Sequence, residues 1–400
     1  MMSFKYIRNI FVILALLSVF FFVGFKLGGD RVGVSDNTGS LNLSLMWKVK
    51  DKLSQNFLEK EKMIDKEMEY GVIKGMVAAL DDPYTVFLSP DENKSANEDL
   101  AGQFGGVGIS LGYKDKTLAV MSPLPKSPAE KAGIKAGDLI LKIIDKENNI
   151  DKETNDMALD EAVKLIRGKI GTEVTLKMFR EGKMAAYDVV LKRDNIIVPS
   201  IELEWKEKNG KKVAWVKLYK FTETLFEEWP AKVVEINKEK EKGNFGGIIL
   251  DLRNNPGGFL QASVLVASDF IKSGTVVTQK SSNGKEEKYD VLPDMGNLLN
   301  DKLVVLINEG SASAAEILAG SIKDFKRAVL IGEKSFGKGT VQQPEDFLDG
   351  SGLHITIAKW LLPSGKNIHK EGITPDIEIK SGDDLKNDLQ LNKAIEVLLK

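Results

Sequence analysis

The second half of the chain alternates short apolar runs with helical patterns, and this alternation predicts an α/β fold. Continuous apolar runs are typical of buried strands, whereas apolar positions three and four residues apart are typical of amphipathic helices. Pro230 interrupts one helical stretch, which is therefore expected to form either one helix or two pieces. The expected strands are 213–218, 246–252 and 303–308, and the expected helices are 222–242, 311–325 and 383–400.

A long apolar run, 10–25, lies at the N-terminus behind the basic residues Lys5 and Arg8. Its length falls between that of a signal-peptide core and a full membrane span of about 20 residues. Because no Ala-x-Ala cleavage site follows, we expect an uncleaved single-pass anchor in the cell membrane, with a cleaved and exported form as the alternative. The positive-inside rule places the remainder of the chain outside the cytoplasm.

Between this anchor and the α/β core, the pattern changes twice. A linker rich in Gly, Asp and Ser leads into a helical segment that ends in a turn at 81–84. A β-rich module then carries a glycine-rich loop and a helix with one apolar face. The expected order is anchor 1–28, linker 29–40, helical segment 41–96, β-rich module 97–193, core 194–378 and C-terminal helix 379–400.

Composition narrows the candidate chemistry. The 400 residues include no cysteine and two histidines, and the net charge is -2. A Cys-His pair is therefore excluded, and the absence of a basic excess argues against a nucleic-acid partner. His354 and His369 have no metal-like cluster nearby, so we interpret both as structural or surface residues and expect neither a metal nor another cofactor.

Serine and lysine side chains offer an acyl-transfer site that needs no histidine. Ser311 and Ser313 follow the expected strand 303–308 at the start of a helix, where free N–H groups favour negative charge. One of the two can cap the helix while the other attacks. Lys338 lies between two glycines, with Phe336 close by. To act as a base, it needs a pKa lowered by desolvation from about 10.4 to about 7 to 8.

A glycine turn after the expected strand 246–252 offers oxyanion donors. The N–H of Gly257 or Gly258 could act together with that of Ala314, next to Ser313. Taken alone, Asn-Pro-Gly-Gly is more often an ordinary loop.

Three blocks, 251–258, 311–317 and 336–342, together resemble the C-terminal processing peptidases, also called tail-specific proteases. The resemblance implies a crotonase/ClpP-like core in which Ser313 is the nucleophile, Lys338 the general base and Gln342 the residue that orients the lysine. The four-residue step from Lys338 to Gln342 could bring the amide to the amine in a compact local conformation. A homodimer paired through the N-terminal helical segment is a further expectation from the resemblance.

The β-rich module resembles a PDZ domain, which binds a C-terminal tail as an added strand. The glycine-rich loop lacks the lysine and Ser/Thr of a phosphate loop. Arg167, after the groove helix, either couples tail capture to the active site or is a solvated helix-end cation. The resemblance places the tail carboxylate at Gly105, Gly106 and Val107 and the apolar groove at Leu159, Val163 and Ile166.

These features predict an exported serine endopeptidase that captures apolar C-terminal tails of proteins or peptides through a PDZ domain and hydrolyses them by a Ser-Lys mechanism. Two alternatives remain open. A non-catalytic PDZ scaffold would bind tails without cutting them, and an acyl-transfer enzyme on a related core would use a similar oxyanion hole.

Overall fold

The computed structural model describes residues 42–114, 117–124, 126–380 and 388–400. The expected anchor at 10–25 and the linker at 29–40 lie outside these residues. Among the helices of the described ranges, none is both long and apolar enough to cross a membrane. The chain divides into two compact units, residues 1–71 and 72–400.

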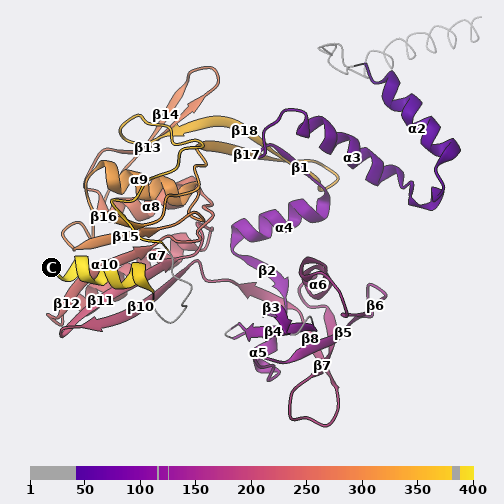
Figure 1. Ribbon diagram of the computed structural model, residues 1–400, viewed down its shortest axis with the longest axis horizontal. Coiled ribbons are helices and arrows are strands. Elements are labelled where there is room, and N and C mark those ends of the chain that lie inside the picture. Colours follow the sequence, from indigo (N-terminus) through magenta and orange to yellow (C-terminus); the bar gives the residue numbers. More distant parts are fainter. Residues whose placement is uncertain (1–41, 115–116, 125, 381–387) are drawn as a thin grey trace, which may run out of the picture. The chain divides into compact units, whose positions relative to one another are not determined.

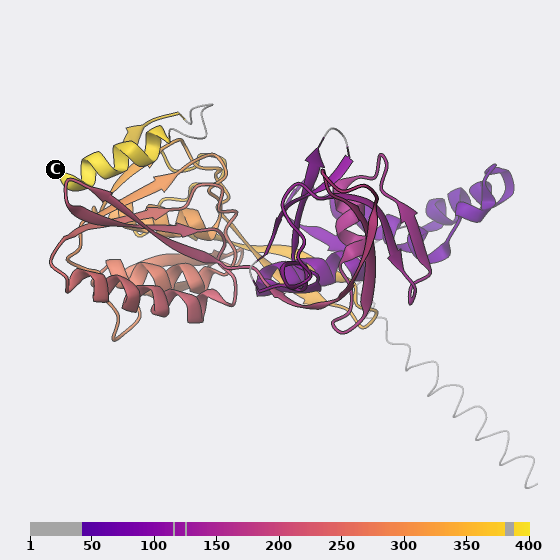
Figure 2. The same cartoon turned by 90° about the horizontal axis from the view of Figure 1, so that it is seen from below.

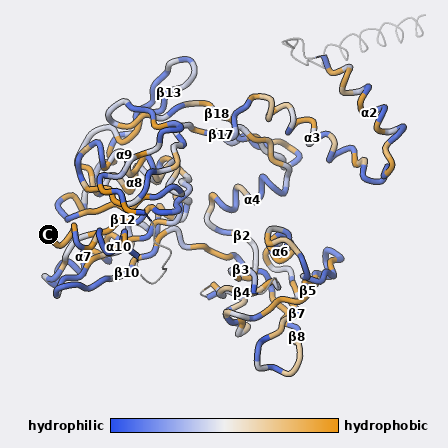
Figure 3. The backbone as a smooth tube through the Cα atoms, in the orientation of Figure 1, coloured by the Kyte–Doolittle hydropathy of each residue, from blue (hydrophilic) through white to orange (hydrophobic). Residues whose placement is uncertain are grey.

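The first unit contains α2 and the beginning of α3 (Figure 1). No residue of α2 is buried, and Leu45 and Trp47 are 69% and 55% exposed. Figure 3 shows hydrophilic and hydrophobic stretches alternating along this helix. The spacing that predicted a helix therefore leaves its apolar residues exposed to solvent. The elements are α2 (Ser44–Asn56), a 3-10 helix (Lys60–Lys62) and α3 (Asp65–Ala78).

The β-rich module is built on an antiparallel sheet around its own hydrophobic core, which includes Leu118, Ile140 and Leu176. The sheet order is β3-β4-β5-β7-β8, with β6 paired to β5, while β2 pairs with β9. The elements are β2 (Gln103–Gly106), β3 (Ile109–Lys114), β4 (Thr117–Pro123), α5 (Pro128–Lys131), β5 (Leu139–Asp145), β6 (Ile150–Glu153), α6 (Leu159–Ile166), β7 (Glu173–Phe179), β8 (Tyr187–Lys192) and β9 (Asp194–Ile197).

The α/β core predicted from the sequence is confirmed. Its six-stranded sheet has the order β10-β11-β12-β15-β16-β19, and every pair except β10-β11 is parallel. The strands are β10 (Ile201–Lys208), β11 (Lys211–Leu218), β12 (Phe245–Asp251), β15 (Leu303–Ile307), β16 (Val329–Gly332) and β19 (Ile377–Glu378).

Helices cover both faces of this sheet because its central strands are apolar on both faces. Ile248 and Leu250 of β12 pack in the same cluster as α7, α8 and α9, whereas Ile249 packs in the cluster of α10. Figure 2 shows α10 on one side of the sheet and the salmon-coloured helices on the other. The helices are α7 (Leu225–Lys240), α8 (Leu260–Phe270), α9 (Ala314–Asp324) and α10 (Leu389–Leu399).

Helix α7 continues through Pro230 as a single helix. Trp229 and Val233, on either side of the proline, are buried in the core. Tertiary packing therefore holds together a stretch that the sequence left open as one helix or two.

A second, antiparallel sheet joins distant parts of the chain. Its order is β1-β18-β13-β14, and β17 also pairs with β18. Strand β1 precedes the β-rich module in sequence, yet its Val86 lies opposite His354 of β18. The elements of this region are β1 (Val86–Leu88), α4 (Pro90–Ala101), β13 (Thr275–Ser281), β14 (Glu286–Asp290), β17 (Thr340–Asp346) and β18 (Gly352–Leu361).

Candidate active site

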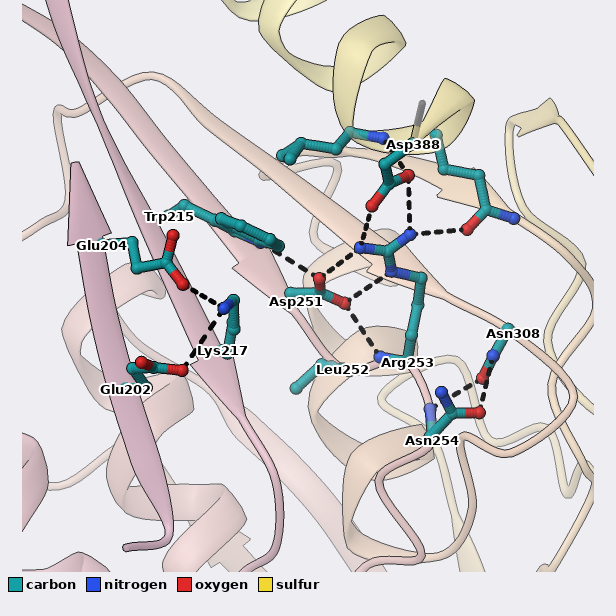
Figure 4. Close-up of polar contacts among 12 residues, drawn as sticks. Glu202, Glu204, Trp215, Lys217, Asp251, Leu252, Arg253, Asn254, Asn308 and Asp388 are labelled. Carbon is teal, nitrogen blue, oxygen red and sulfur yellow. Dashed lines mark hydrogen bonds and ion pairs between the residues drawn. The ribbon is translucent and has the colours of Figure 1, made fainter. Parts of the chain in front are cut away.

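The turns after β12 and β15 lie side by side, because these neighbouring parallel strands end at the same edge of the sheet. Asn254 N donates to Asn308 Oδ1 at 2.8 Å, and Asn308 Nδ2 donates back to Asn254 Oδ1 at 2.9 Å (Figure 4). Ala312 N also donates to the carbonyl oxygen of Asn255 at 2.9 Å. The glycine turn and the Ser-Ala turn are therefore tied together through both side chains and backbone.

Arg253 fixes the first residues of the glycine turn (Figure 4). Its guanidinium donates to both oxygens of Asp251 at 2.9 and 2.6 Å and to both oxygens of Asp388 at 2.9 and 2.8 Å. Trp215 Nε1 donates to Asp251 at 3.0 Å. Asp388 is the N-cap residue of α10, so the C-terminal helix is connected directly to the turn that leads to the glycines.

Ser311 belongs to the scaffold of the turn. Its side chain is fully buried, its hydroxyl donates to the carbonyl oxygen of Leu252 at 2.8 Å, and it accepts from Asn308 N at 3.0 Å. The hydroxyl therefore already donates one hydrogen bond and accepts another within the protein.

Ser313 is half-buried and occupies the N-cap position, so α9 begins at Ala314 and not at residue 311 as expected. Its backbone has φ 54° and ψ -116°, which no helix can accommodate. A non-glycine residue in such a region costs about 1 to 3 kcal/mol and is characteristic of functional sites.

Gly257 packs directly against the Ser313 backbone. A Cβ atom at Gly257, where φ is +99°, would lie 2.7 Å from Ser313 Cβ and 3.0 Å from Ala314 N. The Gly257 N–H donates to Asn255 Oδ1 at 2.9 Å and is thus already used. Within the described part of the chain, the N–H groups of Gly258 and Ala314 have no hydrogen-bond partner. Of the expected oxyanion donors, these two are therefore available in this conformation.

Glu316 connects the Ser313 turn to the Lys338 loop. This buried carboxylate accepts from Ser313 N and Lys338 N through Oε2, each at 2.9 Å. Its Oε1 accepts from Ser335 Oγ at 2.6 Å and from Gly337 N at 2.7 Å. Burial raises the pKa of Glu316, against the opposing effect of these donors. Glu316 was not among the residues predicted for the site, although Ser313-x-x-Glu316 has the spacing of a capping box.

The Lys338 backbone is held on its carbonyl side by Trp360 Nε1, which donates to the Lys338 oxygen at 3.0 Å. The side-chain amine lies 4.9 Å from the centroid of the Tyr84 ring. Burial lowers the pKa of Lys338, while the nearby carboxylate of Asp82 acts in the opposite direction. Among the described residues, the amine has no hydrogen-bond partner. The local environment is therefore the desolvated one that a lysine base requires.

Gln342 lies in β17, an extended strand, so the compact conformation considered for the step from Lys338 is not adopted. Its Nε2 donates to Thr340 Oγ1 at 2.9 Å and to Thr356 Oγ1 at 3.2 Å. In the described residues it makes no hydrogen bond to Lys338. The amide is nevertheless anchored through its nitrogen, which leaves its oxygen free to accept.

Tyr84 and Asp82 were read in the sequence only as part of a turn, and the structure brings both to Lys338. No local signal could have found them, because the contact depends on the pairing of β1 with β18. The two histidines also lie in this region. The His369 ring meets the Tyr84 ring edge-on at 6.2 Å, and His354 Nε2 and His369 Nδ1 are buried without a hydrogen-bond partner in the described chain.

In the β-rich module, the structure divides the expected carboxylate residues between β2, which holds Gly105 and Gly106, and the loop after it, which holds Val107. Gly105 and Gly106 are in β2 and pair with β9, whereas residues 107–108 form the loop that enters β3. Of the expected groove residues, Leu159 is exposed and Val163 half-buried.

Ile166 belongs to the hydrophobic core of the module and not to an open groove surface. Arg167 is stacked 3.8 Å from the Phe104 ring centroid and lies 4.0 Å from Glu98. Its coupling to the active site stays a prediction.

Both the β-rich module and the α/β core resemble known protein families. The model of the PDZ domain matches residues 97–178, and that of peptidase family S41 matches residues 212–379. The chain is 36% identical over 353 residues to the carboxy-terminal processing protease CtpA of Bacillus subtilis, covering 87% of this chain and 71% of that protein. It is 39% identical over 316 residues to a probable CtpA-like serine protease of Staphylococcus haemolyticus, covering 79% and 60%.

Among solved structures, the photosystem II D1 C-terminal processing protease aligns with a TM-score of 0.51 and 30% identity, covering 88% of this chain and 91% of that one.

Proposed function

Because this chain belongs to peptidase family S41 as a serine-type carboxyl-terminal processing peptidase, we propose that it uses Ser313 as nucleophile and Lys338 as general base. The observation that carries this assignment is the arrangement around Glu316, which binds the backbone N–H groups of both residues at 2.9 Å. The buried, hydrogen-bonded hydroxyl of Ser311 argues for Ser313 over its neighbour.

In the proposed reaction, Lys338 accepts the Ser313 hydroxyl proton as Oγ attacks the peptide carbonyl carbon. The carbonyl oxygen becomes an oxyanion, which the free N–H groups of Gly258 and Ala314 stabilise. The protonated lysine then gives its proton to the leaving amine as the C–N bond breaks. A water molecule, deprotonated by Lys338, then attacks the acyl carbon. The ester bond to Ser313 Oγ breaks, Lys338 returns the proton to Oγ, and the product leaves with a new C-terminal carboxyl group.

Gln342 has a supporting role in this proposal. Its amide nitrogen is held by the hydroxyls of Thr340 and Thr356, so its oxygen is the group that can accept a hydrogen bond from the Lys338 ammonium. Gln342 thus orients the base without changing its charge.

The PDZ module supplies the substrate in this account. We infer that an apolar C-terminal tail adds to the sheet beside β3, with side chains against Leu159 and Val163 of α6. The tail carboxylate would be captured at the start of β3, where the 107–108 loop lies, and not at Gly105 and Gly106. The position of the 107–108 loop supports this site: it lies between β2, which already pairs with β9, and the first residue of β3.

Membrane attachment through residues 10–25, an extracytoplasmic catalytic part and a homodimer remain proposals. The basic and apolar pattern of the N-terminus supports the first two. The exposed apolar residues of α2 support the third. Protease accessibility in intact cells and sedimentation of the purified chain would test them.

The catalytic assignment is tested with a quenched fluorescent peptide that ends in apolar residues. We expect cleavage by the unaltered protein, none by Ser313→Ala or Lys338→Met, and retained cleavage by Ser311→Ala. Tail binding should persist in all of these variants, because the substitutions lie outside the PDZ module. Binding without cleavage by the unaltered protein would refute the proposal in favour of a scaffold.

A further inference from the structure

We propose that Tyr84 is a positioning residue for Lys338, so that the turn before β1 is part of the catalytic machinery. The inference deepens the proposed function, because it concerns the residue assigned there as the base. The Lys338 amine lies 4.9 Å from the Tyr84 ring centroid, its one aromatic contact among the described residues. That separation lies within the range of a cation–π interaction, about 6 Å.

The Tyr84 turn is firmly held. Asp82 accepts from Tyr84 N at 3.1 Å and from Thr85 Oγ1 at 2.7 Å. Thr85 Oγ1 in turn accepts from Thr356 N of β18 at 3.1 Å, and β1 continues this contact by pairing with β18. The hydroxyl of Thr356 accepts from Gln342 Nε2 at 3.2 Å. One hydrogen-bonded network therefore fixes both the Tyr84 turn and the amide proposed to orient the lysine.

The Tyr84 ring also contacts a second ring. The His369 ring meets it edge-on at 69° between planes. The residue is half-buried, and burial raises the pKa of its hydroxyl, followed by the nearby charges of Glu316 and Asp82. A neutral phenol is the form expected over the working pH range, so the ring presents an uncharged face to the amine.

Two consequences for Lys338 follow from this placement. The ring occupies space that water would otherwise fill, and it thereby favours the neutral amine. Its π face also confines the amine when it is protonated, next to the loop that Glu316 ties to Ser313. The titratable groups that act on the amine are Asp82 and Tyr84 from the turn and His354 from β18. Glu316 of α9 binds the Lys338 backbone N–H, and His369 contacts Tyr84 and acts on Asp82.

Three substitutions separate the two effects. Tyr84→Phe keeps the ring and should stay within about threefold of the unaltered kcat/KM. Tyr84→Ala admits water, so the acid limb of the pH profile should move up by about one pH unit and kcat/KM at pH 7 should fall about tenfold. Tyr84→Leu keeps water out but has no π face. Because the lost π contact favoured the protonated amine, the acid limb should not move up, and kcat should fall with KM little changed.

Competitive acetylation, mapped by mass spectrometry to the peptide that contains Lys338, gives a readout independent of proteolysis. The pKa of the Lys338 amine should rise in Tyr84→Ala and stay constant in Tyr84→Phe. If the unaltered protein cleaves nothing but this difference is found, the proposed function fails and the role of Tyr84 toward the lysine stands.

The inference is overturned if Tyr84→Leu matches Tyr84→Phe in kcat, or if Tyr84→Ala leaves both the pH profile and the acetylation of Lys338 unchanged. Should Tyr84→Ala fail to fold, the comparison of Tyr84→Leu with Tyr84→Phe still decides the matter. Thermal melting shows whether Tyr84→Ala folds. Tail binding shows whether the PDZ module of each variant is intact.

Discussion

The substitution Glu316→Gln would break the connection between the proposed nucleophile and base while changing a single atom type. If the new amide keeps its oxygen toward Ser335 and Gly337, its NH₂ group replaces the oxygen that now accepts from Ser313 N and Lys338 N. The N–H groups of Ser313 and Lys338 then face the new NH₂ group, and none of these three donor groups has an acceptor there. The two turns are expected to separate.

The magnitude follows from the two bonds that are lost. A hydrogen bond to a charged acceptor contributes about 1.5 to 3 kcal/mol, and a buried donor left unpaired costs about 1 to 3 kcal/mol. Some of this loss is relieved by local rearrangement, and the remainder divides between folding and catalysis. If about 3 to 4 kcal/mol falls on the active conformation, kcat/KM drops by about 10² to 10³.

Peptide cleavage by Glu316→Gln should be measured beside Glu309→Gln, which makes the same charge change at an exposed residue of the adjoining turn. We expect the loss in kcat with KM nearly constant, because the proposed tail-binding site lies in the PDZ module and not at Glu316. The reasoning is refuted if Glu316→Gln stays within about threefold of Glu309→Gln, since the two hydrogen bonds would then carry about 0.7 kcal/mol or less.

Three further substitutions test separate parts of the site. Lys338→Met should raise the melting temperature at pH 7. Burial lowers the folded-state pKa of the lysine, so the unfolded chain binds the proton more tightly and the protonated lysine destabilises the folded protein. This destabilisation is complete below the folded-state pKa and vanishes above about 10.4. The difference in melting temperature between Lys338→Met and the unaltered protein should therefore be smaller at pH 10 than at pH 7. A difference that grows with pH would show that burial does not destabilise the protonated lysine. Gly257→Ala should reduce kcat/KM by at least about 10² without altering tail binding, because its Cβ would lie 2.7 Å from Ser313 Cβ; near-normal turnover would mean that the turn can move freely. Ser311→Ala should lose about 1 to 3 kcal/mol of stability in denaturant titrations yet still cleave peptide, because it leaves Asn308 N and the Leu252 oxygen without their buried partner; full loss of cleavage in a folded protein would reverse the roles of the two serines.

The elements that the sequence predicts well are those with a strong local signal. Strands β12 and β15 are continuous apolar runs buried on both faces, and both lie within one residue of the expected bounds. The glycine turn and the Ser-Ala turn follow from their positions at the ends of these strands. Parallel neighbours must bring such turns to one edge, so their proximity could be expected from strand order alone.

Other features depend on information that no local pattern contains. Tyr84 reaches Lys338 only because β1 pairs with a strand late in the sequence. Ser313 breaks the helical pattern through its positive φ, and Gly257, distant in sequence, packs against it. The orientation of Gln342 depends on the hydroxyl of Thr356 across the β17-β18 pair.

The pairing of Ser313 with Lys338 is tested most directly by labelling the intact protein with a fluorophosphonate and locating the adduct by mass spectrometry. The account predicts one adduct on Ser313, its absence in Lys338→Met, and unchanged labelling in Ser311→Ala. An adduct on Ser311, or labelling of Ser313 at the normal rate without Lys338, would contradict it.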